Sequence, residues 1–137
     1  MLQIIFKPTF ISLLLVFSID LSCTGSDPQD KDRAKNITIN MVTHGQASDP
    51  FWSVVSNGAK AAAEDLGIRL VYQSPQNFDM VAMSQIIDAV IATDPDGLVL
   101  SVPDIPALKR SISSAVKKNI PIIVINSGSK IMEEMDM

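Results

Sequence analysis

Hydrophobic residues along this chain form short continuous runs that alternate with longer stretches in which they recur every three or four positions. The short runs, 37–42, 68–73, 98–100 and 120–125, are mostly β-branched or leucine residues and predict four strands. The longer stretches between them predict helices, over about 50–66, from about 79 and from about 104. Strands that alternate with helices predict an α/β fold, with a doubly wound, Rossmann-like parallel sheet.

Residues at the predicted helix ends support these assignments. Asp49 followed by Pro50 predicts an N-cap and a proline in the first helical turn, Gly67 predicts the end of that helix, and Asp104 can cap the third helix. The apolar positions predicted to face the core from the first helix are Val54, Val55, Ala59, Ala62, Ala63 and Leu66. Those of the second and third helices are Met83, Ile86, Ile87, Val90, Ile91, Leu108, Ile112, Ala115 and Val116. The continuous run 120–125 is typical of a central strand covered on both faces.

Length, composition and charge restrict the possible classes of protein. A chain of 137 residues has room for one domain at most. Hydrophobic residues at 47% and charged residues at 19% suit a globular core and argue against disorder. The net charge is −4 and no basic stripe is present, which argues against a nucleic-acid-binding surface. Cys23 is the only cysteine, so an internal disulfide and a cysteine-based metal site are excluded.

The first 36 residues predict export and anchoring rather than a folded element. Lys7 and the apolar stretch 10–19 make residues 1–22 typical of a signal peptide. Small residues then precede Cys23, which resembles a bacterial lipobox and implies a lipid-anchored first residue, although Asp20 stands where that pattern has a large aliphatic residue. The alternative is ordinary signal cleavage nearby and an unmodified cysteine. Residues 23–36 are polar with alternating charges and predict a flexible tether, so the fold begins at residue 37.

An ordered series of short motifs resembles one known family. Residues 43–52 read Thr-His-Gly-Gln-Ala-Ser-Asp-Pro-Phe-Trp, and Pro-Asp-Gly-Leu at 95–98, Ser-Val-Pro-Asp at 101–104 and the run 120–128 follow in order. This series is similar to the type I periplasmic binding proteins, in particular the ribose-binding-like sugar-binding subunits of bacterial ABC importers. The resemblance implies strand order 2-1-3-4. It also implies that residues 37–137 are an incomplete first lobe of a two-lobed fold, with the beginning of a further helix at 130–137.

The candidate binding residues follow the ends of the predicted strands. Ligands of open α/β sheets bind outside the carboxyl ends of the strands, where aromatic rings can stack on a sugar and amides or carboxylates can bind its hydroxyl groups. The resemblance adds a family position to Asp104, to Asn77 and to Ser127. The candidate ligand-binding residues are Thr43, Gln46, Phe51, Trp52, Asn77, Asp104 and Ser127.

Each candidate also has a purely structural interpretation. Asp104 could serve only as a helix cap, as Asp49 is expected to, and the rings of Phe51 or Trp52 could pack on the sheet. His44 is the only histidine, and a single histidine in a loop is interpreted as a hydrogen-bonding group rather than a catalyst. Other polar residues that follow the strand ends are Gln76, Ser101 and Asn126.

These features predict an exported solute-binding protein, in the periplasm or cell envelope, that captures a small sugar or polyol for the permease subunits of an ABC transporter. Capture would occur by closure of two lobes, without a cofactor or metal. One alternative is a sugar-sensing domain that presents its ligand to a receptor. Another is the first half of an α/β enzyme, but the chain lacks the glycine-rich dinucleotide loop, the Walker lysine loop and the nucleophile elbow, so a non-enzyme is predicted.

Overall fold

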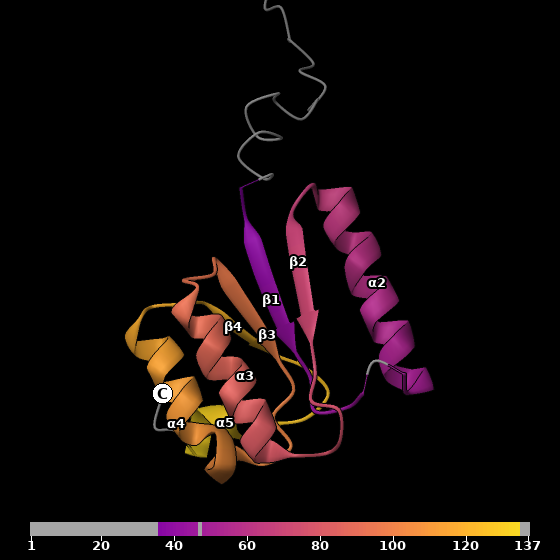
Figure 1. Ribbon diagram of the computed structural model, residues 1–137. Helices are drawn as coiled ribbons and strands as arrows, with labels where there is room; N and C mark the ends of the chain where they lie inside the picture. The colour runs from indigo at the N-terminus through magenta and orange to yellow at the C-terminus, as the bar shows by residue number, and fades with distance from the viewer. Residues whose placement is uncertain (1–35, 47, 135–137) are drawn as a thin grey trace, which may run out of the picture.

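The computed structural model describes residues 36–46 and 48–134 (Figure 1). The predicted signal peptide, the predicted lipidation site at Cys23 and all of the predicted tether except Asn36 lie outside these residues.

The described residues form one parallel sheet with the predicted strand order. Its strands are β1 (Thr38–Val42), β2 (Arg69–Gln73), β3 (Gly97–Leu100) and β4 (Ile122–Val124). They lie in the order β2-β1-β3-β4, which confirms the doubly wound topology and the order 2-1-3-4. The register places Val42 opposite Leu100 and Leu100 opposite Val124, so the carboxyl ends of β1, β3 and β4 are level at one edge.

Helices cover both faces of the sheet. Helix α2 (Pro50–Leu66) lies on one face, whereas α3 (Met80–Ala92) and α4 (Ile105–Lys117) lie on the other, and the short α5 (Ile131–Glu134) follows β4 (Figure 1). Asp49 caps α2 and Asp104 caps α4, as predicted. Gly67 ends α2 with a φ of 67°, in the left-handed region that favours glycine at this position.

The main core lies between the sheet and the pair α3 and α4. Its largest fully buried side chains come from β1, β3, α3, α4 and the segment that follows β3: Val42, Met83, Ile87, Leu98, Leu100, Val102, Leu108 and Ile112. The inward positions predicted for α3 and α4 are confirmed except at Val116, which is 39% exposed near the end of α4. Burial of this interdigitated apolar surface is the main term that stabilises the fold.

The predicted inner face of α2 is partly wrong. Val54 and Leu66 are 72% and 64% exposed, and Ala62 is exposed as well. The helix packs instead through a narrower stripe, in which Trp52, Ser56 and Ala63 are buried. A helix at the edge of a sheet buries fewer positions per turn than a helix over its centre, and here one of them is a serine that hydrophobic periodicity does not detect.

The interpretation of 120–125 as a central strand covered on both faces is also wrong for the described structure. Strand β4 is at the edge of the described sheet, and Ile123 is 63% exposed. Ile122 and Val124 point to the side of the main core and pack against it, whereas Ile123 points to the face that carries α2, which lies beside β2 rather than β4. A continuous apolar run therefore did not predict which face of the strand is covered by helices.

Candidate functional site

Loops that follow the first two strands, together with the start of α2, border an open cavity of about 580 Å³ at the carboxyl edge of the sheet. The backbone brings the strand ends together, since Thr43 N donates to Gln73 O at 3.1 Å and Ser101 N donates to Val42 O at 3.2 Å. We call this space the strand-end cavity. The residues that line it are His44, Gly45, Gln46, Ser48, Asp49, Trp52 and Phe78.

Four rings cross this region in a row, each perpendicular to the next. The ring centroids of Phe51 and Trp52 are 5.0 Å apart, those of Trp52 and His44 are 5.1 Å apart, and those of His44 and Phe78 are 5.8 Å apart. The interplanar angles are 86°, 81° and 82°, which is the favourable edge-to-face geometry. This aromatic row has two exposed ends, Phe51 at 53% and Phe78 at 69%, and a buried ring between them, Trp52 at 5%.

Gly45 is what allows Trp52 to occupy its position. A Cβ atom at residue 45 would overlap the indole nitrogen and the adjacent Cδ1 of Trp52. The indole therefore lies directly against the backbone of the loop after β1. Asp49 Oδ1 caps the start of α2, where it accepts from Phe51 N at 2.8 Å and from Trp52 N at 3.4 Å. The backbone of Trp52 is therefore fixed by the cap, and its ring is fixed by the loop that contains Gly45.

His44 is joined to the loop after β3 by two short contacts. Ser101 Oγ lies 2.8 Å from the backbone nitrogen of His44 and 2.8 Å from its ring nitrogen Nδ1. Ser101 is fully buried, whereas His44 is partly buried. Burial lowers the pKa of His44 below its ordinary value of 6.5, so the imidazole is neutral at pH 7.

The structure divides the predicted site residues between the strand-end cavity and its surroundings. Gln46 and Trp52 line the cavity, and Phe51 packs on Trp52 beside it. Thr43 is fully buried, with Oγ1 2.7 Å from the Tyr72 hydroxyl and 3.2 Å from Gly45 O. It therefore stabilises the loop after β1 without lining the cavity. Asn77 is exposed and directly precedes Phe78, which is the neighbour that lines the cavity.

Asp104 and Ser127 follow β3 and β4, on the same edge of the sheet but outside the lining of the strand-end cavity. Asp104 is exposed and its Oδ1 accepts from Ala107 N at 3.0 Å, which is the cap. Ser127 lines a separate space of about 380 Å³ at the end of β4. Its Oγ is buried and has no hydrogen-bond partner among the described residues, whereas its carbonyl accepts from Val102 N at 3.1 Å.

Several residues of this region were not in the candidate set derived from the sequence. Asp49 was interpreted only as a helix cap, and the others are His44, Gly45, Ser48, Phe78 and Ser101. Phe78 was missed because it lies in a loop that was interpreted only through its polar residues. His44 and Ser101 were recognised as polar residues after strand ends, but their contact joins positions 57 residues apart in the sequence. A ring in an otherwise polar loop was the one signal that could have indicated Phe78.

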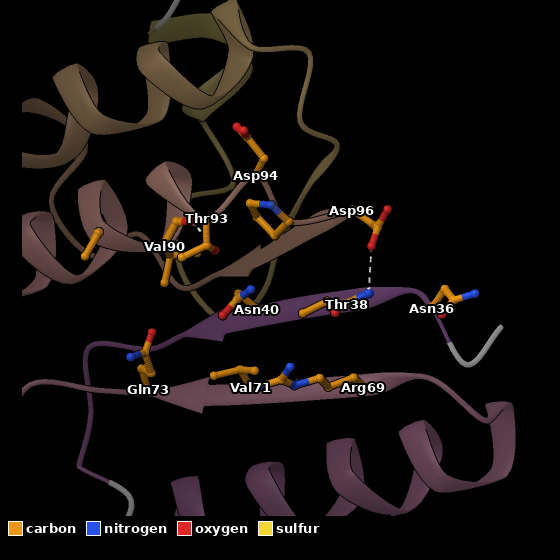
Figure 2. Close-up of a pocket in the computed structure, with 12 residues that line it drawn as sticks. Asn36, Thr38, Asn40, Arg69, Val71, Gln73, Val90, Thr93, Asp94 and Asp96 are labelled. Carbon is orange, nitrogen blue, oxygen red and sulfur yellow. Dashed lines mark hydrogen bonds between the residues drawn. The ribbon is translucent and has the colours of Figure 1, made fainter. Parts of the chain in front are cut away.

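A second cavity, of about 600 Å³, lies over β1 and β2 beside the end of α3. Figure 2 shows Thr38 and Asn40 on β1 and Arg69, Val71 and Gln73 on β2, with Asn40 directed toward the end of α3. We call this space the sheet-face groove. Thr93, Asp94 and Asp96 close it, and Asp96 Oδ2 accepts from Thr38 N at 2.7 Å. No aromatic ring is among its lining residues.

Residues 36–46 and 48–134 contain no group of three or more His, Cys, Asp or Glu side chains that could hold a metal ion. None of the helices in the same part of the chain has the length and apolar character needed to span a membrane.

The sequence matches a family model described as a periplasmic binding protein domain, over residues 39–136. The chain belongs to the periplasmic binding protein family. Open α/β sheets bind their ligands outside the carboxyl ends of the strands, which is the edge where the strand-end cavity lies.

Solved structures of periplasmic binding proteins are similar to this chain. A carbohydrate transporter from Acidothermus cellulolyticus in complex with myo-inositol is 34% identical, with a TM-score of 0.66 over 73% of this chain and 34% of the other. A periplasmic sugar-binding protein of an ABC sugar transporter from Legionella pneumophila is 32% identical, with a TM-score of 0.68 over 72% of this chain and 36% of the other.

A third similar structure is an ABC transporter solute-binding protein from Agrobacterium vitis bound with α-D-tagatopyranose. It is 28% identical, with a TM-score of 0.60 over 64% of this chain and 29% of the other. No curated protein matches the sequence. The chain thus spans about a third of the length of these solved relatives, which are two-lobed, and it corresponds to part of one lobe.

Proposed function

We propose that this chain is part of an exported solute-binding protein that captures a small sugar or polyol for an ABC importer. The observation that carries the proposal is the strand-end cavity, where an aromatic row borders amide and carboxylate groups at the carboxyl edge of the sheet. Similarity to sugar-binding proteins of ABC transporters supports the same assignment.

The chemistry of the cavity suits a hydroxylated, uncharged ligand. Phe51 and Phe78 are exposed rings that can stack on the apolar C–H face of a sugar. Asp49 uses Oδ1 to cap α2, and its Oδ2 makes no hydrogen bond to the described residues. That oxygen and the Gln46 amide can take ligand hydroxyl groups, which both donate and accept.

Trp52 permits a direct test, because it is the only tryptophan in the chain and lines the cavity. The chain corresponds to part of one lobe and supplies one side of the cleft, so titration with myo-inositol and D-tagatose at millimolar concentrations should change its intrinsic fluorescence in a saturable manner, with weaker affinity than that of a two-lobed protein. Phe78→Ala should weaken binding roughly fivefold, because a stacked ring contributes about 1 kcal/mol. Val81→Ala is the matched control, since Val81 is 68% exposed and Phe78 is 69% exposed.

A saturable response that Phe78→Ala weakens and Val81→Ala leaves unchanged would support the proposal. A fluorescence change that does not saturate, or that both variants alter equally, would contradict it. Binding without turnover is expected, since the proposed mechanism is closure around a ligand and not chemistry. Conversion of either sugar by the protein would favour the alternative of an α/β enzyme.

The proposal includes a lipid anchor at Cys23, with the permease subunits of the importer as partners. The cysteine follows an apolar leader and precedes a polar segment, which is the arrangement that supports it. Metabolic labelling with a fatty-acid probe should mark the wild type and not Cys23→Ser. Equal labelling of both would contradict lipidation of Cys23 and would leave the sugar-binding proposal unaffected.

The genes beside this one can separate an importer from a sensor. Permease and ATPase genes would favour an importer, and a chemoreceptor or kinase gene would favour a sensor.

A further inference from the structure

The hydrogen bonds of Ser101 determine which nitrogen of His44 carries the proton. A backbone N–H can only donate, so Ser101 Oγ accepts the bond from His44 N at 2.8 Å. Ser101 is fully buried, and its own hydroxyl proton therefore needs an acceptor. Among the described residues the acceptor within reach is His44 Nδ1, also at 2.8 Å.

A nitrogen that accepts a hydrogen bond is unprotonated, and a neutral imidazole then has its proton on the other nitrogen. We propose that Ser101 holds His44 as the Nε2–H tautomer, and that this N–H donates to a hydroxyl oxygen of the ligand in the strand-end cavity. The second half of this inference rests on the proposed function. The first half depends only on the contacts between the two residues.

The surroundings of His44 support a donor role. Trp52 and Phe78 pack edge-to-face with the imidazole and restrict its rotation, and Nε2 has no hydrogen-bond partner among the described residues. Asp49 and Gln46 line the same cavity. One hydroxyl group of a polyol can therefore accept from His44 while its proton goes to a carboxylate or amide oxygen.

This arrangement also predicts the charge of the ligand. The carboxylate of Asp49 lies in the lining of the cavity, where it repels an anionic ligand, and a neutral imidazole supplies no compensating positive charge. We therefore expect neutral polyols and sugars to bind in preference to sugar acids. In this cavity, His44 selects for an acceptor oxygen and Asp49 selects against negative charge.

The tautomer can be measured without any ligand. His44 is the only histidine, so a chain labelled with ¹⁵N-histidine gives a single pair of ring nitrogen signals. At pH 7 the wild type should show a protonated Nε2 and an unprotonated Nδ1. Ser101→Ala should instead show averaged signals, because the group that discriminates between the nitrogens is gone. Averaged signals, or a protonated Nδ1, in the wild type would overturn the assignment.

Two substitutions separate the nitrogens when myo-inositol is titrated. His44→Gln places an amide N–H near the position of Nε2, whereas His44→Asn places one near Nδ1. His44→Asn should bind roughly tenfold more weakly than the wild type, and His44→Gln within about threefold, since one hydrogen bond is lost or kept. Galacturonate is the charged probe and should bind more weakly than galactose to the wild type.

The outcomes of the ligand test are distinguishable from failure of the proposed function. If neither myo-inositol nor galactose binds the wild type, the proposed function and the donor role both fall, while the nitrogen signals still decide the tautomer. If myo-inositol binds the wild type, Gln and Asn variants equally, the donor role is wrong and sugar binding stands. If the Asn variant loses affinity and the Gln variant keeps it, the donor role is supported.

Discussion

The strand-end cavity and the sheet-face groove have almost the same volume, about 580 and 600 Å³, but very different linings. Loops build the first, and three of its lining residues carry rings, with His44 in contact with both Trp52 and Phe78. Regular strand residues build the floor of the second, whose lining contains aliphatic, hydroxyl, amide and charged side chains and no aromatic ring. Volume therefore does not distinguish the two, whereas the chemistry of the lining does.

The two linings differ because strands and loops fix the direction of a side chain in different ways. Residues of β1 that face the groove, such as Thr38 and Asn40, are fixed in direction by the strand and its register. Residues of the loops are held instead by specific contacts, such as the one between Ser101 and His44. A sugar site needs rings and hydrogen-bonding groups at particular angles, and loops on a rigid sheet can supply them.

Gly45→Ala should have the largest effect on the strand-end cavity. Its Cβ would overlap the indole of Trp52, so the ring or the loop must move. Overpacking of this kind typically costs about 1–3 kcal/mol, and we expect the upper end together with loss of sugar binding. Urea unfolding and a sugar titration provide the measurement.

Gly58→Ala is the matched control for this substitution. A Cβ at Gly58 in α2 would meet nothing within 4 Å, so the variant should gain about 0.5–1 kcal/mol of helix stability. Equal stability of Gly45→Ala and the wild type would refute the packing of Trp52 on the loop.

Asp104→Ser tests whether the ligand-binding site includes Asp104, which lies outside the lining of the strand-end cavity. Serine can still cap α4 but lacks a carboxylate, so the melting temperature should stay near that of the wild type. If Asp104 binds a ligand hydroxyl, the affinity for myo-inositol should fall roughly tenfold by calorimetry. Unchanged affinity would leave Asp104 as a cap only.

Much of this architecture could be predicted from the sequence, because it depends on local patterns. Alternation of strands and helices, the caps at Asp49 and Asp104, and the stop at Gly67 all involve residues close together in the chain. The predictions for Val54 and for Ile123 failed because hydrophobicity does not state how much surface a neighbouring element covers.

The candidate site was less predictable than the fold, for a related reason. Position after a strand was enough to indicate Gln46 and Trp52, both of which line the strand-end cavity. The pairing of His44 with Ser101 and the row that ends at Phe78 depend on contacts between separate loops. Periodicity carries no information about such contacts, so they required the structure.

Asn40→Leu tests whether the sheet-face groove contributes to sugar binding. Asn40 is 5% exposed and lines this groove, and it is not among the lining residues of the strand-end cavity. Leucine, which has a similar size, would make the groove more apolar and would leave the strand-end cavity unchanged. The affinity for myo-inositol should remain within about twofold of the wild type. A large loss of affinity would move the sugar site to the groove.

The smallest expected effect is on the pH dependence of stability. Because the pKa of His44 in the folded protein is below 6.5, the unfolded chain binds the proton more readily than the folded chain. The free energy of unfolding should be highest above pH 6.5 and should decrease as the pH falls from 6.5 through the lower folded-state pKa. In His44→Gln this part of the slope should vanish. Identical profiles for the two proteins would contradict the effect of burial on His44.

Mapping of the bound ligand on the backbone of the protein tests most directly whether the strand-end cavity is the sugar site. Addition of myo-inositol to the ¹⁵N-labelled chain should shift the amide signals of residues 44–46, 49–52 and 78 and the indole signal of Trp52. Signals from residues 38–40 and 69–73, on the strands that form the floor of the sheet-face groove, should not move. Shifts confined to those strands, or no shifts at millimolar myo-inositol, would contradict the claim that the strand-end cavity is the sugar site.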